Sequence, residues 1–170
     1  MTVQEAIQQR FSVRAYADKP VEEDKLLRVL EAARLAPSAG NRQEWRFVVV
    51  RDAATRAALA EAANGQAFVA QAPVVIAACA SGEQHVMTCG QLCYPIDVAI
   101  ALEHIALQAT EEGLGTCWIG AFKEDQVKKV LGLPEAVRVV QLMPLGYPAA
   151  EAPAKRRLEL SEIVHWEKWE

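Results

Sequence analysis

The sequence predicts one α/β or α+β domain with a single sheet, and three observations lead to this class. The chain has 170 residues, 52% of them apolar, which is enough for one substantial core. Helix-like and strand-like apolar patterns alternate irregularly along the chain. No long Gly/Ser linker, charge block or internal repeat divides the sequence, so residues 1–170 are expected to form one domain.

The N-terminal region predicts two helices. Thr2 is expected to cap a helix that runs to about Arg10, and Glu5 completes a capping box. A second helix is expected over Glu22–Leu35, because acidic residues fill its first turn and Pro37 ends it. Its buried stripe is predicted to contain Leu26, Leu27, Leu30 and Ala33.

The rest of the chain predicts strands and helices in alternation. Strands are expected over Trp45–Val50, Pro73–Ala80, Thr116–Ala121 and Val137–Pro144. Helices are expected over Ala53–Ala63, capped by Asp52, over Ile96–Thr110, and over Lys123–Leu131, stopped by Gly132. The second strand is apolar without alternation, which is typical of burial on both faces. The Ile96–Thr110 helix is apolar on most sides and needs cover on all of them, which a partner subunit would provide.

Charge and hydropathy exclude several classes of protein. A net charge of −4 argues against a general nucleic-acid binder. No apolar run reaches the roughly 18–20 residues of a membrane helix. The N-terminus, MTVQEAIQQR, lacks the features of a secretory signal, so we expect a cytoplasmic protein with reduced cysteines and no membrane partner.

The histidines and cysteines do not predict a metal site. Cys89 and Cys93 lie four residues apart and Cys79 ten residues earlier, a spacing that matches no standard zinc pattern. The histidines are far apart in the sequence, and His104 in the apolar helix is interpreted as a core or interface residue. The roles of Cys79, Cys89, Cys93 and Cys117 stay open.

Basic residues near both termini are more informative. In RFSVRAY, Arg10, Ser12 and Arg14 alternate, so an extended backbone points all three to the same side. Two guanidinium groups and a hydroxyl on one side could bind an anion. A second basic group, Lys155–Arg157, lies near the other terminus. Both groups could hold one phosphate, or they could be two solvated charged patches.

Two further segments offer backbone groups to a ligand, although each is weak by itself. The loop in APSAGNRQEWRFVVV, residues 36–50, presents backbone N–H groups and the amides of Asn41 and Gln43. In GLGTCWIGAF, residues 113–122, Gly120 would let a backbone approach a ligand closely. The dinucleotide fingerprint GxGxxG, the P-loop and the GxSxG motif are all absent.

Together, RFSVRAY, APSAGNRQEW, GLGTCWIGAF, PLGYP and KRRLELSEIV closely resemble the nitroreductase family of FMN-dependent oxidoreductases. Their order and spacing match over nearly the whole chain. The resemblance implies an α+β, nitroreductase-like fold with a mostly antiparallel central sheet flanked by helices. It also implies an intertwined homodimer with FMN at the subunit interface, and the Ile96–Thr110 helix resembles the family's central interface helix.

By the same resemblance, the cofactor-binding residues can be placed one by one. Arg10 and Ser12 match residues at the FMN phosphate and ribityl chain, and Arg14 matches a cation beside the flavin pyrimidine edge. Lys155 and Arg157 match the basic pair that holds the phosphate; Arg156 is not carried over. The loop that reaches FMN from the other subunit corresponds to Pro37, Ser38, Ala39 and Asn41, which Gln43 supports. The segment over one flavin face corresponds to Trp118, Ile119, Gly120 and Ala121.

The resemblance implies hydride transfer from NADH or NADPH through flavin N5 to a small acceptor such as a nitroaromatic or quinone, in a ping-pong mechanism. No side chain is then required as an acid or base. Alternatives are a specialised flavoenzyme of the same family, with enone, dehalogenating or flavin-directed chemistry, and a non-catalytic FMN-binding module. Glu44 stands where the family usually has proline, and either stiffens the loop differently or places a carboxylate near the site mouth. The compact region 81–95 is expected to shape substrate access, with Tyr94, Cys89 and Cys93 as candidates for the pocket wall.

Overall fold

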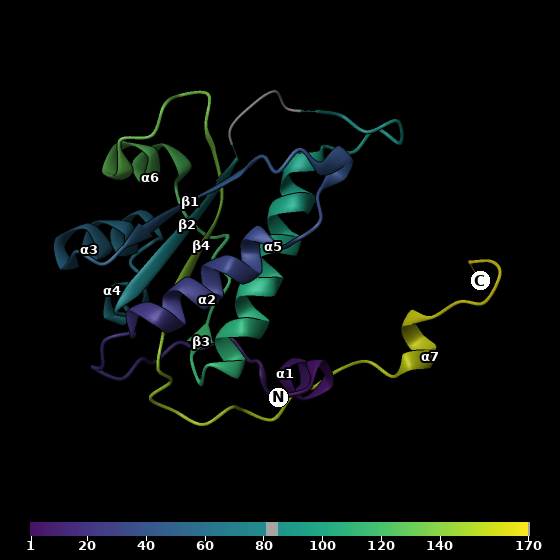
Figure 1. Ribbon diagram of the computed structural model, residues 1–170, viewed down its shortest axis with the longest axis horizontal. Coiled ribbons are helices and arrows are strands. Elements are labelled where there is room, and N and C mark those ends of the chain that lie inside the picture. Colours follow the sequence, from purple (N-terminus) through teal and green to yellow (C-terminus); the bar gives the residue numbers. More distant parts are fainter. Residues whose placement is uncertain (81–84, 170) are drawn as a thin grey trace.

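A computed structural model describes residues 1–80 and 85–169. Four strands, β1 (Trp45–Val50), β2 (Val74–Ala80), β3 (Gly115–Thr116) and β4 (Arg138–Gly146), form one sheet in the order β1-β2-β4-β3. Each neighbouring pair is antiparallel, with Val50 opposite Val75 in one ladder and Val74 opposite Leu145 in the next. The mixed class and the antiparallel sheet confirm the predicted fold class (Figure 1).

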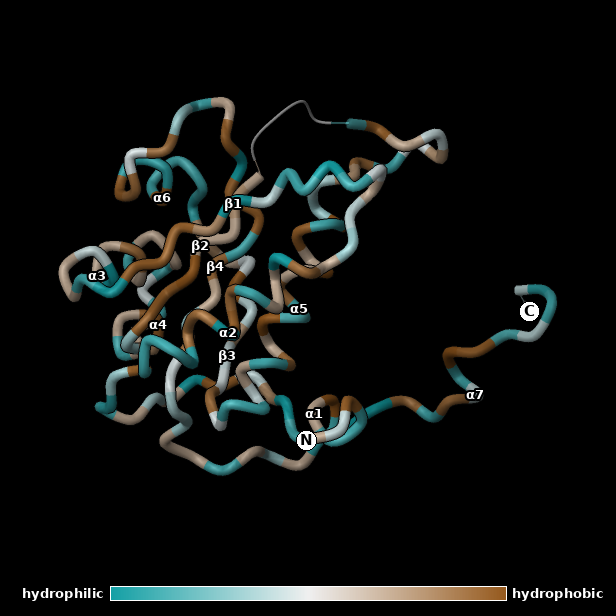
Figure 2. The backbone as a smooth tube through the Cα atoms, in the orientation of Figure 1, coloured by the Kyte–Doolittle hydropathy of each residue, from teal (hydrophilic) through white to brown (hydrophobic). Residues whose placement is uncertain are grey.

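Helices cover both faces of this sheet (Figure 1). One face packs against α2 (Glu23–Arg34) and α5 (Cys93–Glu111), and we call this side the α5 face. The other packs against α3 (Ala53–Ala62), α4 (Ala67–Gln71) and α6 (Glu124–Leu131), and we call it the α3 face. Every residue of β2 is buried, as the apolar run without alternation predicts (Figure 2).

Local signals fix most element boundaries. The helix α1 (Val3–Gln9) begins after Thr2, which forms the predicted capping box with Glu5. Asp52 accepts a hydrogen bond from the backbone N–H of Thr55 and caps α3. Gly132 ends α6 in the left-handed conformation, with φ 63°.

Three sequence predictions need correction. Leu27 is 56% exposed, because the buried stripe of α2 follows Leu26, Val29 and Ala33 instead. The helix α5 begins at Cys93, three residues before the predicted start, because Pro95 is accommodated in its first turn. The predicted strand 116–121 pairs regularly only at β3, and Ile119 makes an isolated bridge to Leu142.

The C-terminal segment leaves the body of the molecule (Figure 1). It contains one short helix, α7 (Leu160–Ile163), and its apolar side chains have little cover. The exposed ones are Leu158, Leu160, Ile163, Trp166 and Trp169. Within residues 1–80 and 85–169, no helix combines the length and hydropathy needed to span a bilayer. Trp166 and Trp169 are 82% and 88% exposed, far more than is usual for tryptophan.

Candidate functional site

The N-terminal segment lies against the edge strand β3. Ser12 forms a parallel bridge with Thr116, and the Val13 N–H donates to the Thr116 carbonyl at 2.9 Å. A Cβ on Gly115 would lie 2.3 Å from the Val13 side chain, so glycine is required for this approach. Val13 is buried, whereas Ser12 is half-buried and Arg14 exposed, a pattern that agrees with alternation along an extended segment.

The two ends of the chain meet at the end of α1. The Lys155 ammonium donates to the carbonyl of Ile7 at 3.3 Å and to that of Gln8, two acceptors in the last turn of the helix. Burial lowers the pKa of Lys155, and the positive charges of Arg10 and Arg157 lower it further. Lys155 contacts the last turn of α1, whose C-cap is Arg10, and Arg157 follows Lys155 by two residues, so we call Arg10, Lys155 and Arg157 the terminal basic cluster.

The terminal basic cluster carries more positive than negative charge. Arg10 lies 3.6 Å from the Glu103 carboxylate, an ion pair between α1's end and α5. In the described part of the chain, neither Lys155 nor Arg157 pairs with a carboxylate. Three cations around one acid fit a phosphate monoester, which would bring two negative charges and acceptors for charge-assisted hydrogen bonds. The residues present therefore fit the phosphate end of FMN.

Arg14 continues the site along the same segment. Its guanidinium donates to the Ser12 carbonyl at 3.5 Å and is otherwise exposed. Burial raises the pKa of the Cys117 thiol, and the Arg14 charge and a hydrogen bond from Ser12 oppose that rise. Arg14 and Ser12 thus lie beside Cys117, directly before the segment that sequence analysis places over the flavin.

In the segment 118–121, some backbone groups are already hydrogen-bonded within the sheet and others are not. The Ile119 N–H donates to the Leu142 carbonyl at 2.9 Å and its carbonyl accepts from the Leu142 N–H at 3.1 Å, so the sheet already uses both groups. Trp118 packs against the core of the α5 face. Gly120 is exposed, and its N–H has no acceptor within the described residues. The Gly120 N–H is therefore an exposed donor in this segment that a ligand could use.

The loop 37–43 is held by its own hydrogen bonds. The Gln43 N–H donates to the Ser38 hydroxyl at 3.0 Å, and the Gln43 amide donates to the carbonyl and side-chain oxygens of Asn41 at 3.3 and 3.0 Å. Gly40, Asn41 and Gln43 all have positive φ, between 53° and 59°. A non-glycine residue there costs free energy, and such strain is concentrated at binding sites. Gln43 thus stabilises the loop conformation through these bonds, and its role toward FMN stays a prediction.

A single chain does not bring this loop to the terminal basic cluster. The Ala39 N–H donates to the Asp97 Oδ1 atom at 3.1 Å, which ties the loop to the start of α5. Arg10 contacts the same helix at Glu103, farther along, and α1 lies beside its last turns (Figure 1). The two halves of the expected cofactor site are thus separated within the subunit. Sequence analysis assigns the loop to the other subunit's FMN, an assignment that remains a prediction.

Asp97 and Glu103 were missed by sequence analysis as functional residues. They are the two carboxylates within the otherwise apolar stretch Ile96–Thr110. Asp97 is 3% exposed, and its Oδ2 atom has no hydrogen-bond partner in the described residues. A charge in an apolar helix was the available signal, because a buried charge requires a partner.

The expected pocket wall is only partly exposed. Cys93 and Tyr94 are buried and Cys89 is exposed; residues 81–84 of that wall lie outside the described residues. One carboxylate oxygen of Glu44 is buried without a hydrogen-bond partner in the described chain. Burial raises the pKa of Cys93; the charges of Asp97 and Glu44 add to that rise, and the charge of Arg42 opposes it. Glu44 therefore lies near the start of α5.

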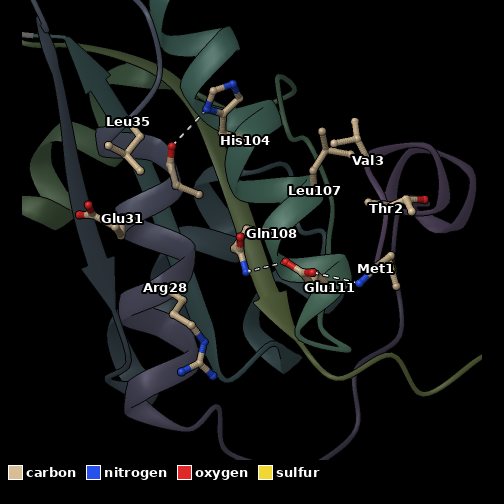
Figure 3. Close-up of a pocket in the computed structure, with 12 residues that line it drawn as sticks. Met1, Thr2, Val3, Arg28, Glu31, Leu35, His104, Leu107, Gln108 and Glu111 are labelled. Carbon is tan, nitrogen blue, oxygen red and sulfur yellow. Dashed lines mark hydrogen bonds and ion pairs between the residues drawn. The ribbon is translucent and has the colours of Figure 1, made fainter.

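A groove of about 550 Å³ lies between α1, α2 and α5 (Figure 3). Leu107 and the half-buried His104 line it, and His104 Nδ1 lies 3.2 Å from the Ala32 carbonyl oxygen. Two of its lining residues are largely exposed, Val3 at 73% and Leu35 at 64%. An apolar face around the central helix agrees with the expectation that α5 needs further cover.

The chain is similar to known proteins both in sequence and in fold. The model of the nitroreductase family matches residues 7–81 and 62–147. A protein of Thermus thermophilus named NADH dehydrogenase is 37% identical, over 92% of each chain. The FMN reductase [NAD(P)H] of Bacillus subtilis is 29% identical, over 93% of this chain and 70% of its own. The crystal structure of a nitroreductase family protein from Clostridium novyi NT superimposes with a TM-score of 0.83 at 38% identity, covering 87% of this chain and 86% of its own.

Proposed function

The chain belongs to the nitroreductase family, and we propose that it is an FMN-dependent NAD(P)H oxidoreductase acting on a small acceptor such as a nitroaromatic or a quinone. Residues 1–170 would act as one FMN-binding domain. The observation that carries the proposal is the contact of Lys155 with the end of α1 at Arg10, which brings basic residues from the two ends of the chain together. The naming of a similar protein as an FMN reductase that uses NAD(P)H supports it.

In this proposal the terminal basic cluster holds the FMN phosphate, and Ser12 lies at the ribityl chain. When bound, FMN supplies an atom, N5, that accepts and releases a hydride. The free Gly120 N–H would donate a hydrogen bond at that atom, with Trp118 and Ile119 forming the surface beneath the ring. Ile119 contributes its buried side chain and not its N–H, which Leu142 already binds.

Arg14 would act on the electronics of the ring. Its guanidinium is exposed, one step along the segment from the phosphate site, where the flavin pyrimidine edge is expected. A cation at that edge stabilises the negative charge that develops on reduction. The donor and the acceptor would use the same face in turn, which gives ping-pong kinetics and requires no acid or base from the chain.

The site would be completed by a second copy of the chain in an intertwined homodimer. The loop residues Pro37, Ser38, Ala39 and Asn41 would reach the partner's FMN. The unpaired apolar surface at α1, α5 and the C-terminal arm supports this arrangement. Light scattering of the purified protein tests it: a mass of two chains is expected, and a monomer that binds FMN tightly would contradict it.

The first test is the visible spectrum of the purified protein and the mass of the molecule released by heat. Flavin bands, FMN in the supernatant and steady NAD(P)H oxidation with a nitroaromatic or quinone are expected. Bound FMN without turnover would indicate a binding module. Turnover confined to an enone, a halogenated substrate or free flavin would indicate the specialised enzyme.

A double variant tests the phosphate site directly. Lys155→Ala with Arg157→Ala removes two of the three cations, and we expect the protein to lose FMN on dialysis because charge-assisted phosphate bonds are lost. Arg156→Ala is the control, since it removes one positive charge from the same tripeptide outside the proposed phosphate site and should retain FMN. Full retention of FMN by the double variant would place the phosphate elsewhere.

A further inference from the structure

Asp97 makes one specific bond from inside the molecule to a surface loop. Its side chain is 3% exposed on α5, and Oδ1 accepts the Ala39 N–H at 3.1 Å. Ala39 begins the short 3₁₀ turn that carries Gly40 and Asn41 at positive φ. This bond crosses from the core helix to the loop, whereas the Ser38–Gln43 and Asn41–Gln43 bonds lie within the loop.

The energetic setting of Asp97 is unusual. A buried carboxylate normally accepts several hydrogen bonds, yet Oδ2 has no partner among the described residues. Near the start of α5, Cys93 and Glu44 add a thiol and a second carboxylate; the charge of Arg42 also acts there, but no ion pair joins Arg42 to Asp97 in the described residues, and the Arg42 guanidinium donates to the Ala39 carbonyl at 3.1 Å. Core packing alone would favour an apolar residue at this position, because one bond offsets only part of the desolvation cost.

We propose that Asp97 is a positioning residue, which fixes the loop 37–43 in its ligand-binding conformation through the Oδ1–Ala39 bond. This inference rests on the proposed function, in which the loop contacts the flavin. Without the anchor, the three left-handed residues can relax toward ordinary backbone conformations. Ligand binding then has to return these residues to the left-handed conformation, which costs free energy. FMN affinity therefore decreases even though no ligand contact has been removed.

The first variant removes the acceptor. Asp97→Ala should weaken FMN binding by about 10-fold, the order expected for one hydrogen bond to a charged acceptor. Riboflavin binding should weaken by the same factor, because the loop does not serve the phosphate. Asp97→Asn keeps an oxygen for the Ala39 N–H and should stay within about 3-fold of wild type. Wild-type affinity in Asp97→Ala, or equal losses for Asn and Ala, would overturn the proposal.

A second variant removes the donor without touching the core. Ala39→Pro has no N–H, and the position suits proline because Ser38 is extended, at φ −141° and ψ 156°, and a helical turn begins at residue 39. It should weaken FMN binding about as much as Asp97→Ala, and the double variant should add little, since both changes remove the same bond. Additive losses would show that Asp97 acts by another route.

Loop mobility gives a readout that a general loss of stability would not move. In Asp97→Ala, hydrogen exchange should accelerate in the loop 37–43 and stay unchanged in β2, whereas global destabilisation would accelerate both. Unchanged exchange in the loop would overturn the proposal. The Lys155→Ala/Arg157→Ala variant separates the two hypotheses. If it keeps FMN, the proposed site is wrong; if it loses FMN while Asp97→Ala binds normally, only the role of Asp97 is wrong.

Mixed dimers show which subunit the loop serves. An Asp97→Ala chain paired with a Lys155→Ala/Arg157→Ala chain would combine both defects in one site and leave the other site intact. One FMN per dimer should then bind with wild-type affinity, as measured after purification through two different tags. If no site of wild-type affinity appears, the loop acts within its own subunit and the positioning role across the interface is refuted.

Discussion

The two faces of the sheet are packed by similar apolar side chains but differ in their buried polar groups. On the α5 face, Asp97, Thr116 and Gln141 each have a buried oxygen without a hydrogen-bond partner in the described chain. Thr116 lies opposite Leu145 in one strand ladder, and Gln141 lies opposite Ala78 in another. Opposite residues point to the same face of a sheet, and Leu145 and Ala78 are both in the core of the α5 face. The fourth such oxygen in the described chain belongs to Glu44, directly before β1, and none of the four belongs to a residue in the core of the α3 face.

This difference indicates that the α5 face serves function as well as stability. Groups that are buried and unpaired cost free energy and are retained where something besides stability is required. The α5 face adjoins both parts of the proposed site, through the Asp97–Ala39 bond and the Arg10–Glu103 pair. The α3 face adjoins the site only through Cys117 and Ile119, whose side chains belong to its core. Changes in α3 itself, away from these two residues, should alter stability alone, and changes near the α5 face should alter function.

The largest expected effect is on stability from the α3 face. Leu59 is fully buried in α3, and Leu59→Ala should lower the free energy of unfolding by about 3 kcal/mol, the range for a leucine removed from a core. The FMN affinity of the folded fraction should not change. Urea unfolding at fixed protein concentration and FMN fluorescence titration measure the two quantities. A matching loss of affinity would show that the faces are coupled.

In contrast to Leu59→Ala, the variant Arg14→Ala should change the reaction and not the stability. The rate of flavin reduction by NAD(P)H is expected to decrease by about 10-fold, because the cation acts most strongly where charge develops, while FMN affinity changes less. Anaerobic stopped-flow measurements give the rate. Arg51→Ala is the control, because that exposed arginine pairs with Glu23 away from the site. An unchanged reduction rate in Arg14→Ala would remove this residue from the proposed mechanism.

The smallest expected effect concerns the ion pair that joins α6 to β4. Burial tends to raise the pKa of Glu124, but hydrogen bonds from Arg138 and from the Val139 N–H outweigh it and leave the pKa below its usual value. A lowered carboxyl pKa stabilises the fold above the unfolded-state pKa, and the stabilisation is lost as pH falls through the folded-state value. Glu124→Gln should therefore cost about 1 kcal/mol at pH 7.

The pH dependence of that variant makes the test specific. Below the folded-state pKa both wild type and Glu124→Gln carry a neutral group at residue 124, so their unfolding free energies should converge in acid. Urea unfolding of the apoprotein from pH 7 downward measures the difference. FMN affinity at pH 7 should be unaffected. A constant difference at all pH values would assign the effect to packing and not to charge.

Much of the fold could be read from short-range patterns. The Thr2–Glu5 capping box, the Asp52 cap and the stop at Gly132 depend on residues within one turn, so their neighbours in sequence determine them. Leu27 shows the limit of such patterns. Apolar residues at adjacent helical positions compete for the buried face, and only the packing of α2 on α5 decides between Leu26 and Leu27.

The sequence by itself determined the kinds of chemical group that the site would need: alternating basic residues, a loop with amides, and a glycine near the expected ring. The tertiary structure decided which of them meet. It joins Lys155 to the end of α1 and Asp97 to Ala39, residues 58 positions apart. It also shows that Leu142 already uses the Ile119 N–H. Such pairs are set by long-range packing, because no local pattern records which distant group fills a buried hydrogen bond.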